Sequence, residues 1–428
     1  MLKSNIAWMK KNVPSDLKVW KGMIQDIDWS QVAAKTKLSL QRDKDRITAE
    51  FKEFAAMDTS AKIDWLMNGD RHLGYLYKKD AIAFARREWK GLKSVGYDFV
   101  GWLKIWGGML NMVMKDPMSI MLAVFEYHWF ASYLATPAVV DRSVFGRRGK
   151  LLQADFDMWV AITHWAEDLI ANLIMADAKI GGNQKINKRI IMFDEMTMAQ
   201  MMAGFPNLLG IPYQMIPVFM VSEMDQLTLI PYIDAIESYG LPSDTCPLPT
   251  AECGCAVKDE YPMCGQGFIA SSMPCDGSVM ATSFQDRRFS KFMPSYPLCM
   301  PVRYDDEDTT EMAAADMKDC IHWVEGLTGE TWNWDTYFAT MEKMNECTRL
   351  EMEKWEINKT HYPQLVGSSF ELFRKWNYEM DGGLFPEGLK TQRKICKTMM
   401  ETYEKKLPAY VGGYEKYRAL IWSCPAHF

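Results

Sequence analysis

The sequence lacks any excess of basic residues. Among its 428 residues, 49 are Lys or Arg and 55 are Asp or Glu, which gives a formal net charge of -6. Proteins that bind nucleic acids concentrate Lys and Arg on one face, where these side chains meet the phosphate groups. No basic block of that kind occurs in the chain. We therefore expect no nucleic-acid partner.

The chain also lacks a long, uninterrupted apolar run. Residues 1–13 alternate charged and apolar residues without a small-residue cleavage site, so they do not resemble a secretory signal. Residues 99–114 fall short of the roughly 20 residues that cross a bilayer and contain Lys104, and residues 117–140 carry Glu126 near their middle. We expect a cytoplasmic protein without membrane contact, in which both stretches are buried helices.

Several catalytic signatures are absent. The sequence contains no serine nucleophile elbow, no P-loop and no HExxH motif. His164, Glu167 and Asp168 share one helical face and raise the question of a metal site. A di-iron bundle needs Glu-x-x-His pairs on two helices, and none is present. We interpret these three residues as a polar helix face.

The pattern of apolar residues divides the chain into three parts. Residues 1–185 read as helical, because apolar residues recur there at spacings of three and four. Short apolar runs of strand length then alternate with helical segments, at 189–193, 215–221, 267–271 and 298–302. Such runs predict a parallel sheet with helices on its faces.

The predicted fold class is therefore α/β with a large all-α N-terminal region. We expect a helical region at 1–185, followed by a parallel-sheet, Rossmann-like domain at 186–305 that is flanked by helical segments. A further helical segment at 306–428 leads towards a second α/β domain, for which an apolar run at 417–422 resembles the first strand.

Two helices are predicted after residue 306. Asp308 has the position of an N-cap, and Gly329 has the position of a helix stop. A second helix is expected from about Asp335 onwards. Its buried stripe is expected to contain Phe338, Met341, Thr348 and Trp355.

Cysteines are concentrated between residues 245 and 277. Five lie there among Pro and Gly residues: Cys246, Cys253, Cys255, Cys264 and Cys275. Cytosolic reductants keep thiols reduced, so disulfides do not explain them. Thiolates bind iron strongly, and loops allow several sulfur atoms to converge on one cluster. The spacing fits neither zinc ribbons nor the compact ferredoxin run, and buried small side chains are the alternative interpretation.

Cys275 and Cys246 are the best candidates for ligands. Cys275 follows the predicted strand 267–271 and so falls at the carboxyl end of a parallel sheet, where ligand sites of open α/β sheets gather. Cys246 follows a helical segment and opens a proline-bounded loop with the sequence TCPLP. An exposed thiolate in that loop would face the same crevice.

The order of these features resembles the first α/β domain of the 2-hydroxyacyl-CoA dehydratase and benzoyl-CoA reductase family. The resemblance covers residues 188–428 and follows the segments IPVFMV, TCPLPTAECGCAVKDEY, FIASSMPCDGSVMATS and PLCMPVRYDDED. The stretch HWVEGLTGETWNWDTY is similar to the two-helix segment of the family, and EKYRAL is similar to the beginning of its second α/β domain.

The resemblance implies an oxygen-sensitive iron-sulfur enzyme. A 4Fe-4S cluster would be held by three cysteines, two of which would be Cys246 and Cys275. The third cysteine of the family lies in the second α/β domain, beyond the end of this chain. One of Cys253, Cys255 and Cys264 would take its place as the third ligand, or a partner chain would supply that ligand.

The resemblance also implies the reaction and the partners. A chain similar to the D-component of 2-hydroxyglutaryl-CoA dehydratase would dehydrate a 2-hydroxyacyl-CoA through a ketyl radical, after an ATP-hydrolysing activator protein delivers one electron. It would work as a heterodimer with a related subunit. The alternatives are a subunit of a benzoyl-CoA-type aryl-CoA reductase, a relative with a double-cubane cluster, and a non-catalytic scaffold subunit.

Overall fold

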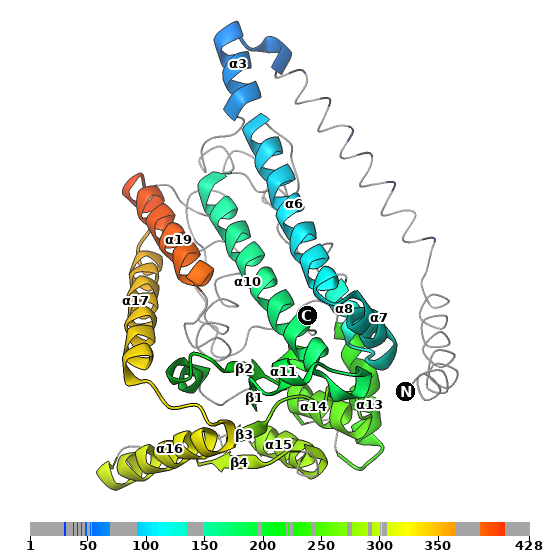
Figure 1. Cartoon of the computed structure of the whole chain (residues 1–428). Coiled ribbons are helices and arrows are strands. Elements are labelled where there is room, and N and C mark those ends of the chain that lie inside the picture. Colours follow the sequence, from blue (N-terminus) through cyan, green and yellow to red (C-terminus); the bar gives the residue numbers. More distant parts are fainter. Residues whose placement is uncertain are drawn as a thin grey trace.

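The structure is a computed structural model of the chain (Figure 1). It describes residues 30, 37, 41, 44, 48, 52, 54–68, 92–134, 149–194, 199–219, 221, 226–241, 245–271, 276–289, 293–299, 301, 306–364 and 386–406. Helices predominate in this part of the chain, and a parallel sheet follows a helical N-terminal region. The predicted fold class is therefore confirmed.

The sheet of the described residues has four parallel strands. They are β1 (Ile190–Phe193), β2 (Leu209–Pro212), β3 (Gly267–Ser271) and β4 (Ser295–Leu298), in the spatial order β2-β1-β3-β4. All residues of β1 and β3 are buried, as their apolar sequences IIMF and GFIAS require in a sheet that is covered on both faces. The chain order reverses between β1 and β3, so the topological switch point of the sheet lies there.

The side chains of β1 alternate between two hydrophobic clusters. Ile190 and Met192 belong to the larger cluster, which includes residues of the N-terminal helices. Ile191 and Phe193 belong to a second cluster with Cys320 and other side chains of the C-terminal helices. Successive strand side chains point to opposite faces, so this alternation shows that both faces of the sheet are packed.

Two of the predicted strands are displaced. The run 215–221 was expected to be a strand, but Met215–Phe219 forms a π-helical turn, η3, and the strand lies earlier, at β2. The fourth strand ends at Leu298, where the predicted one began. Both displaced strands contain proline, Pro212 in β2 and Pro297 in β4. They are the edge strands of the sheet, and an edge strand tolerates the missing N–H of proline.

The helices after the switch point cover the sheet. Three of them pack together: α13 (Ile230–Glu237), α14 (Pro247–Val257) and α15 (Asp276–Phe289). α16 (Glu307–Thr328) packs against β4. Figure 1 shows α14 and α15 beside the strands. Short 3-10 turns, η2 (Ala199–Gly204) and η4 (Gln226–Leu229), complete this half.

The ends of α16 follow from local hydrogen bonding. Its N-cap is Asp306 rather than the predicted Asp308, because the Asp306 carboxylate accepts a hydrogen bond from Thr309 N at 2.7 Å. Asp308 lies in the first turn, where a negatively charged side chain interacts favourably with the helix dipole. Gly329 ends the helix with a φ of 75°, as predicted. α17 (Trp334–Asn358) then begins behind its N-cap Asn333.

The predicted buried stripe of α17 is wrong. Phe338 is 58% exposed and Trp355 is 42% exposed. The buried face contains Glu351 and other polar residues instead, and it packs against α19 (Pro386–Glu404). Gln392 Nε2 of α19 donates to Glu351 Oε1 at 3.2 Å. The neighbouring helix therefore supplies polar partners, which the periodicity of α17 alone does not reveal.

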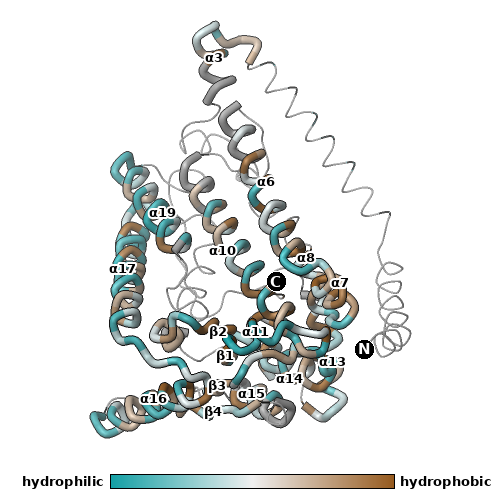
Figure 2. Tube along the Cα trace, viewed as in Figure 1, coloured by the Kyte–Doolittle hydropathy of each residue, from teal (hydrophilic) through white to brown (hydrophobic). Residues whose placement is uncertain are grey.

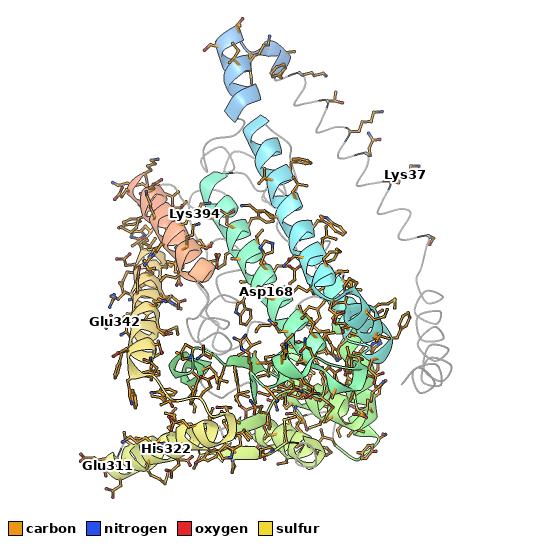
Figure 3. All side chains as sticks on the ribbon, viewed as in Figure 1. Lys37, Asp168, Glu311, His322, Glu342 and Lys394 are labelled. Carbon is orange, nitrogen blue, oxygen red and sulfur yellow. The ribbon has the colours of Figure 1, made fainter. Side chains whose placement is uncertain are left out.

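The N-terminal region contributes five described helices. They are α3 (Thr59–Asn68), α6 (Leu92–Lys115), α7 (Pro117–Glu126), α8 (Phe130–Leu134) and α10 (Gly149–Ala176). After α10 come a 3-10 turn, η1 (Ala178–Ile180), and the short helix α11 (Gln184–Asn187). α10 packs against both α6 and α19, and Lys394 of α19 forms an ion pair with Asp157 of α10 (Figure 3).

As far as they are described, up to residue 134, the two apolar stretches of the N-terminal half form helices, as expected. In the part of the chain that the structure covers, no helix is both long enough and apolar enough to cross a membrane. The expectation that residues 99–114 are buried is half wrong, because Ile105 and Met112 are buried whereas Phe99 and Leu110 are exposed. The predicted strand at 417–422 lies outside the described residues. The domain boundaries at 185 and 305 stay a proposal.

Candidate functional site

A buried carboxylate marks the carboxyl end of the sheet at its switch point. Asp194 follows β1 directly, and Ser271 is the last residue of β3. The Asp194 carboxylate accepts a hydrogen bond from Ser271 N at 2.5 Å and from Ser271 Oγ at 3.0 Å. Both residues are buried. This pair links the ends of the two central strands, at the edge where parallel sheets bind ligands.

A second polar pair lies behind the end of β2. Gln214 follows this strand by two residues, and its Nε2 donates to Gln285 Oε1 of α15 at 2.7 Å. Both amides are buried. In the described part of the chain, Gln285 Nε2 has no hydrogen-bond partner. Sequence reasoning missed both pairs, although a polar residue directly after the apolar run at 189–193 was a usable signal for Asp194.

Cys246 lies at the N-terminus of α14. It has the N-cap position, it is exposed, and its carbonyl oxygen accepts a hydrogen bond from Thr250 Oγ1 at 2.8 Å. α14 ends beside the segment that enters β3, and its 11 residues extend roughly 16 Å away from that point. The start of α14, with Cys246, is therefore expected on the side of the sheet where β3 ends. The proline-bounded loop expected after Cys246 is instead the first turn of this helix.

Cys275 lies outside the described residues. Its neighbour Asp276 is the first residue of α15, so the position of Cys275 in the sequence is between the end of β3 and the start of a helix. Cys246 is at a helix N-terminus, which stabilises negative charge.

Cys299 is a second exposed cysteine that sequence reasoning missed. It follows β4 directly, and its N–H donates to Asp316 Oδ2 of α16 at 2.5 Å. Its position places it at the same carboxyl edge of the sheet. The signal was present in the segment PLCMP, where one cysteine follows a strand, but the predicted strand began at residue 298 and obscured this position.

The other cysteines of the cysteine-rich segment are buried. Cys253 and Cys255 lie on α14 rather than in loops, and Cys264 lies between α14 and β3. Burial, followed by the Glu252 carboxylate, raises the pKa of Cys253 to about 12. Burial, followed by Asp177, raises the pKa of Cys264 well above its ordinary value. Because metals bind the thiolate form, these environments favour the interpretation as core residues.

Cys255 and Cys264 are not gathered around Cys246. Cys255 lies nine residues further along α14, which is roughly 13 Å along the helix axis. Cys264 precedes β3 and contacts Met192 Sδ of β1 through its Sγ at 3.6 Å. Within the described ranges, no group of three His, Cys, Asp or Glu side chains is placed to hold a metal ion.

The amino end of the sheet is occupied by a polar network from the N-terminal helices. Asp177 Oδ1 accepts a hydrogen bond from Met263 N at 2.7 Å, and the Tyr127 hydroxyl donates to the same carboxylate. Glu260 Oε2 accepts from His128 N at 2.8 Å and from the Tyr232 hydroxyl at 2.6 Å. These bonds attach the region of α7 to the segment that enters β3.

A cavity of about 470 Å³ opens at this amino end, lined by Lys179, Asp259, Cys264 and Met293 among others. Lys179 Nζ donates to Asp259 Oδ1 at 2.9 Å. The cavity therefore lies on the side of Cys264, and Cys246 is at the opposite end of α14.

The C-terminal part of the chain matches a known family. Residues 226–428 match the family model described as 2-hydroxyglutaryl-CoA dehydratase, D-component. The resemblance to that family is therefore confirmed for these residues. The match includes Cys246, Cys255, Cys264, Cys275 and Cys299, and it begins after β1 and β2. A search of curated proteins found no match to the chain.

The exposed thiols at the carboxyl edge are relevant to the needs of an iron-sulfur group. A cluster needs soft, accessible thiolates, and Cys246 and Cys299 are the exposed ones among the described cysteines. The exposed cysteine side chains at this edge are therefore of the type that binds an iron-sulfur cluster. The assignment of Cys246 and Cys275 as ligands stays a prediction.

Proposed function

We propose that the chain is a subunit of an enzyme that dehydrates a 2-hydroxyacyl-CoA. The observation that carries this proposal is the match of residues 226–428 to the D-component family, which includes the whole cysteine-rich segment. Dehydration of a 2-hydroxyacyl thioester gives an enoyl thioester and water without net oxidation. An electron supplied to start the reaction is therefore not consumed by it.

We propose Cys246 and Cys275 as ligands of a 4Fe-4S cluster at the carboxyl edge. The exposure of Cys246 and its position at the start of α14 support its role, because a helix N-terminus favours negatively charged groups. Cys299 is the further described cysteine best placed to add a third thiolate. Such a cluster supplies a low-potential electron and a Lewis-acidic iron for the thioester carbonyl.

The chain's own residues would fix this edge. Asp194 holds Ser271 through its backbone N–H and its hydroxyl group, so the last residue of β3 has a fixed position four residues before Cys275. Gln285 connects α15 to the end of β2 through Gln214. These buried bonds fix the end of β1 against β3 and the end of β2 against α15, which supports a site with several ligands.

The family supports three partners. They are an acyl-CoA substrate, a related subunit that forms a heterodimer with this chain, and an ATP-hydrolysing activator protein that delivers one electron. A ketyl radical of the substrate would follow from that electron transfer. Reduction of an aryl-CoA, as in benzoyl-CoA reductases, would use the same cluster and the same partners. The acyl-CoA that the enzyme accepts distinguishes reduction from dehydration.

A non-catalytic scaffold subunit is the second candidate. It is favoured by one observation, namely that the described residues contain no ready group of three metal-binding side chains. Under this interpretation, Cys246 and Cys299 are surface thiols without a metal.

The first experiment counts iron and acid-labile sulfide in the chain purified without oxygen. Roughly four irons per protomer are expected. The iron content per protomer should fall sharply in Cys246→Ala and in Cys275→Ala. A fall in Cys299→Ala would identify Cys299 as the third ligand. Cys264→Ala is the control, because this cysteine is at the other end of the sheet, and its iron should match the wild type. Well-folded wild-type protein with little iron would favour the scaffold.

A further inference from the structure

Four sulfur-containing residues gather at the amino end of the sheet. Cys264 Sγ lies 3.6 Å from Met192 Sδ of β1. Cys264 also lines the cavity of about 470 Å³, together with Met263 and Met293. All four residues belong to the larger hydrophobic cluster, and none is more than 8% exposed. We call Met192, Met263, Cys264 and Met293 the sulfur pocket.

Backbone hydrogen bonds hold the segments of the sulfur pocket in place. Met263 N donates to Asp177 Oδ1 at 2.7 Å. Phe268 N of β3 donates to Pro294 O at 3.1 Å, which fixes the residue after Met293. Segments that are far apart in the sequence therefore meet at fixed positions. A binding site with several ligands requires such a rigid frame.

Gly265 brings the chain close to β1 beside Cys264. Its φ is 89°, in the left-handed region that favours glycine. A Cβ at this position would lie 3.2 Å from Ile190 O and 3.2 Å from Met192 Cγ. The turn therefore packs directly against Met192, and the preceding residue, Cys264, reaches the sulfur atom of Met192.

The cavity connects the sulfur pocket with solvent. Asp259 and Cys264 both line it, but the Asp259 side chain is 58% exposed whereas Cys264 is 1% exposed. The cavity therefore leads from a polar, exposed side to buried sulfur atoms. Lys179 Nζ donates to Asp259 Oδ1 at 2.9 Å, so opposite charges are paired on the exposed side.

The side chains of the sulfur pocket favour a soft, singly charged metal ion. Thiolates and thioethers are soft ligands, which select Cu(I). One thiolate, neutral thioethers and Cu(I) together carry no net charge, which suits a buried site beside β1, a run of hydrophobic residues (Figure 2). Zn²⁺ would leave one positive charge uncompensated. The Asp177 carboxylate does not alter this balance, because its hydrogen bonds and Lys179 already compensate it.

We propose that the sulfur pocket binds one Cu(I) ion through the Cys264 thiolate and the thioethers of its methionines. Binding replaces the thiol proton of Cys264 by Cu(I), and the proton passes to solvent through the cavity. No electron is transferred in this step. The site does not depend on the proposed cluster, because the cavity and Cys246 are at opposite ends of α14.

Cu(I) titration of the full chain without oxygen, in competition with the chelator bathocuproine disulfonate, tests the site. The titrated background variant combines Cys246→Ser, Cys275→Ser and Cys299→Ser, so that the proposed ligands at the carboxyl edge do not bind copper. One Cu(I) per chain is expected. A background variant that binds no copper, or that binds several ions with equal affinity, overturns the proposal.

Variants of one cysteine and one methionine, each made in the background variant, assign the ligands. Cys264→Ala should raise the dissociation constant for Cu(I) by roughly 100-fold. Met192→Leu should raise it by about 10-fold, because it removes a thioether and nearly keeps the side-chain volume. Cys320→Ala and Met201→Leu are the matched controls, because these buried residues belong to the second cluster, on the other face of the sheet. Equal affinities within either pair overturn the proposal.

Two further measurements test the chemistry of the site. Zn²⁺ at the same concentration should not displace Cu(I) from the background variant, because of the uncompensated charge. X-ray absorption at the copper edge should show sulfur neighbours only, and fewer of them in Met192→Leu. Displacement by Zn²⁺, or oxygen and nitrogen neighbours in place of sulfur, would contradict the proposal. Neither outcome bears on the iron content of the carboxyl edge.

Discussion

The two ends of the parallel sheet differ in the exposure of their cysteines and in their hydrogen bonding. At the carboxyl end, Cys246 and Cys299 are exposed, and two helices begin. At the amino end, Cys264 is buried beside Met192, and Asp177 is held by hydrogen bonds from the N-terminal region. Residue type alone therefore does not identify a candidate site in this protein. The end of the sheet at which a cysteine lies distinguishes candidate ligands from core residues.

Thiol reactivity is the largest expected difference between the two ends. In chelator-treated, folded protein, Cys246 and Cys299 should react with iodoacetamide at least 100-fold faster than Cys264, because they are exposed and Cys264 has a raised pKa. Mass spectrometry of peptides after timed labelling gives the rates. Denatured protein is the control, in which all three thiols should react alike. Fast labelling of native Cys264 would remove the distinction.

The amino-end network should dominate stability. Asp177→Ala removes a buried carboxylate and leaves Met263 N and the Tyr127 hydroxyl without their acceptor. We expect the free energy of unfolding to fall by about 4 kcal/mol in urea denaturation. Asp168→Ala is the control, because its ion pair with Lys115 is exposed (Figure 3) and should contribute less than about 1 kcal/mol. Equal losses in both variants would contradict the role of Asp177.

Glu167 provides a smaller, pH-dependent contrast, because it is a buried carboxylate with no hydrogen-bond partner among the described residues. Burial, followed by Asp168, raises its pKa from 4.5 to about 8. A raised folded-state pKa means that its contribution to stability is fully present below the unfolded-state value and is lost as pH rises towards 8.

Glu167→Gln should therefore remove a pH slope between about pH 5 and pH 8. The variant should unfold like the wild type near pH 5 and be about 3 kcal/mol more stable at pH 9, as measured by urea denaturation at each pH. A variant with the same pH slope as the wild type would show that Glu167 is not the source. Burial raises the pKa of Asp177 as well, but Asp177 differs from Glu167 in accepting hydrogen bonds from Tyr127, Met263 and Lys179, which act in the opposite direction.

The central strands of the fold were predictable from sequence, and the edges were not. β1 and β3 are continuous apolar runs, because strands covered on both faces must be apolar throughout. β2 and β4 contain Pro212 and Pro297, which resemble turn residues in a sequence and are tolerated at a sheet edge. The buried face of α17 escaped prediction because its polar residues are satisfied by α19.

The candidate site was predictable in part. The resemblance selected Cys246, and the structure places it exposed at a helix start. Cys253 and Cys255 were read as loop residues because of the neighbouring Pro and Gly, although Pro247 and Pro249 occupy the first turn of α14, where proline is tolerated. Asp194 and Cys299 were missed because their meaning depends on where neighbouring strands end.

The central position of β1 has a consequence for how the chain folds as it is synthesised. β1 and β2 are made first and pair locally. The other side of β1 receives β3, in the register Ile191↔Gly267, only after about 55 more residues. During that interval an apolar strand has an open edge, which invites wrong pairing. A distant parallel contact of this kind closes slowly, so we expect aggregation of the nascent chain to compete with its folding.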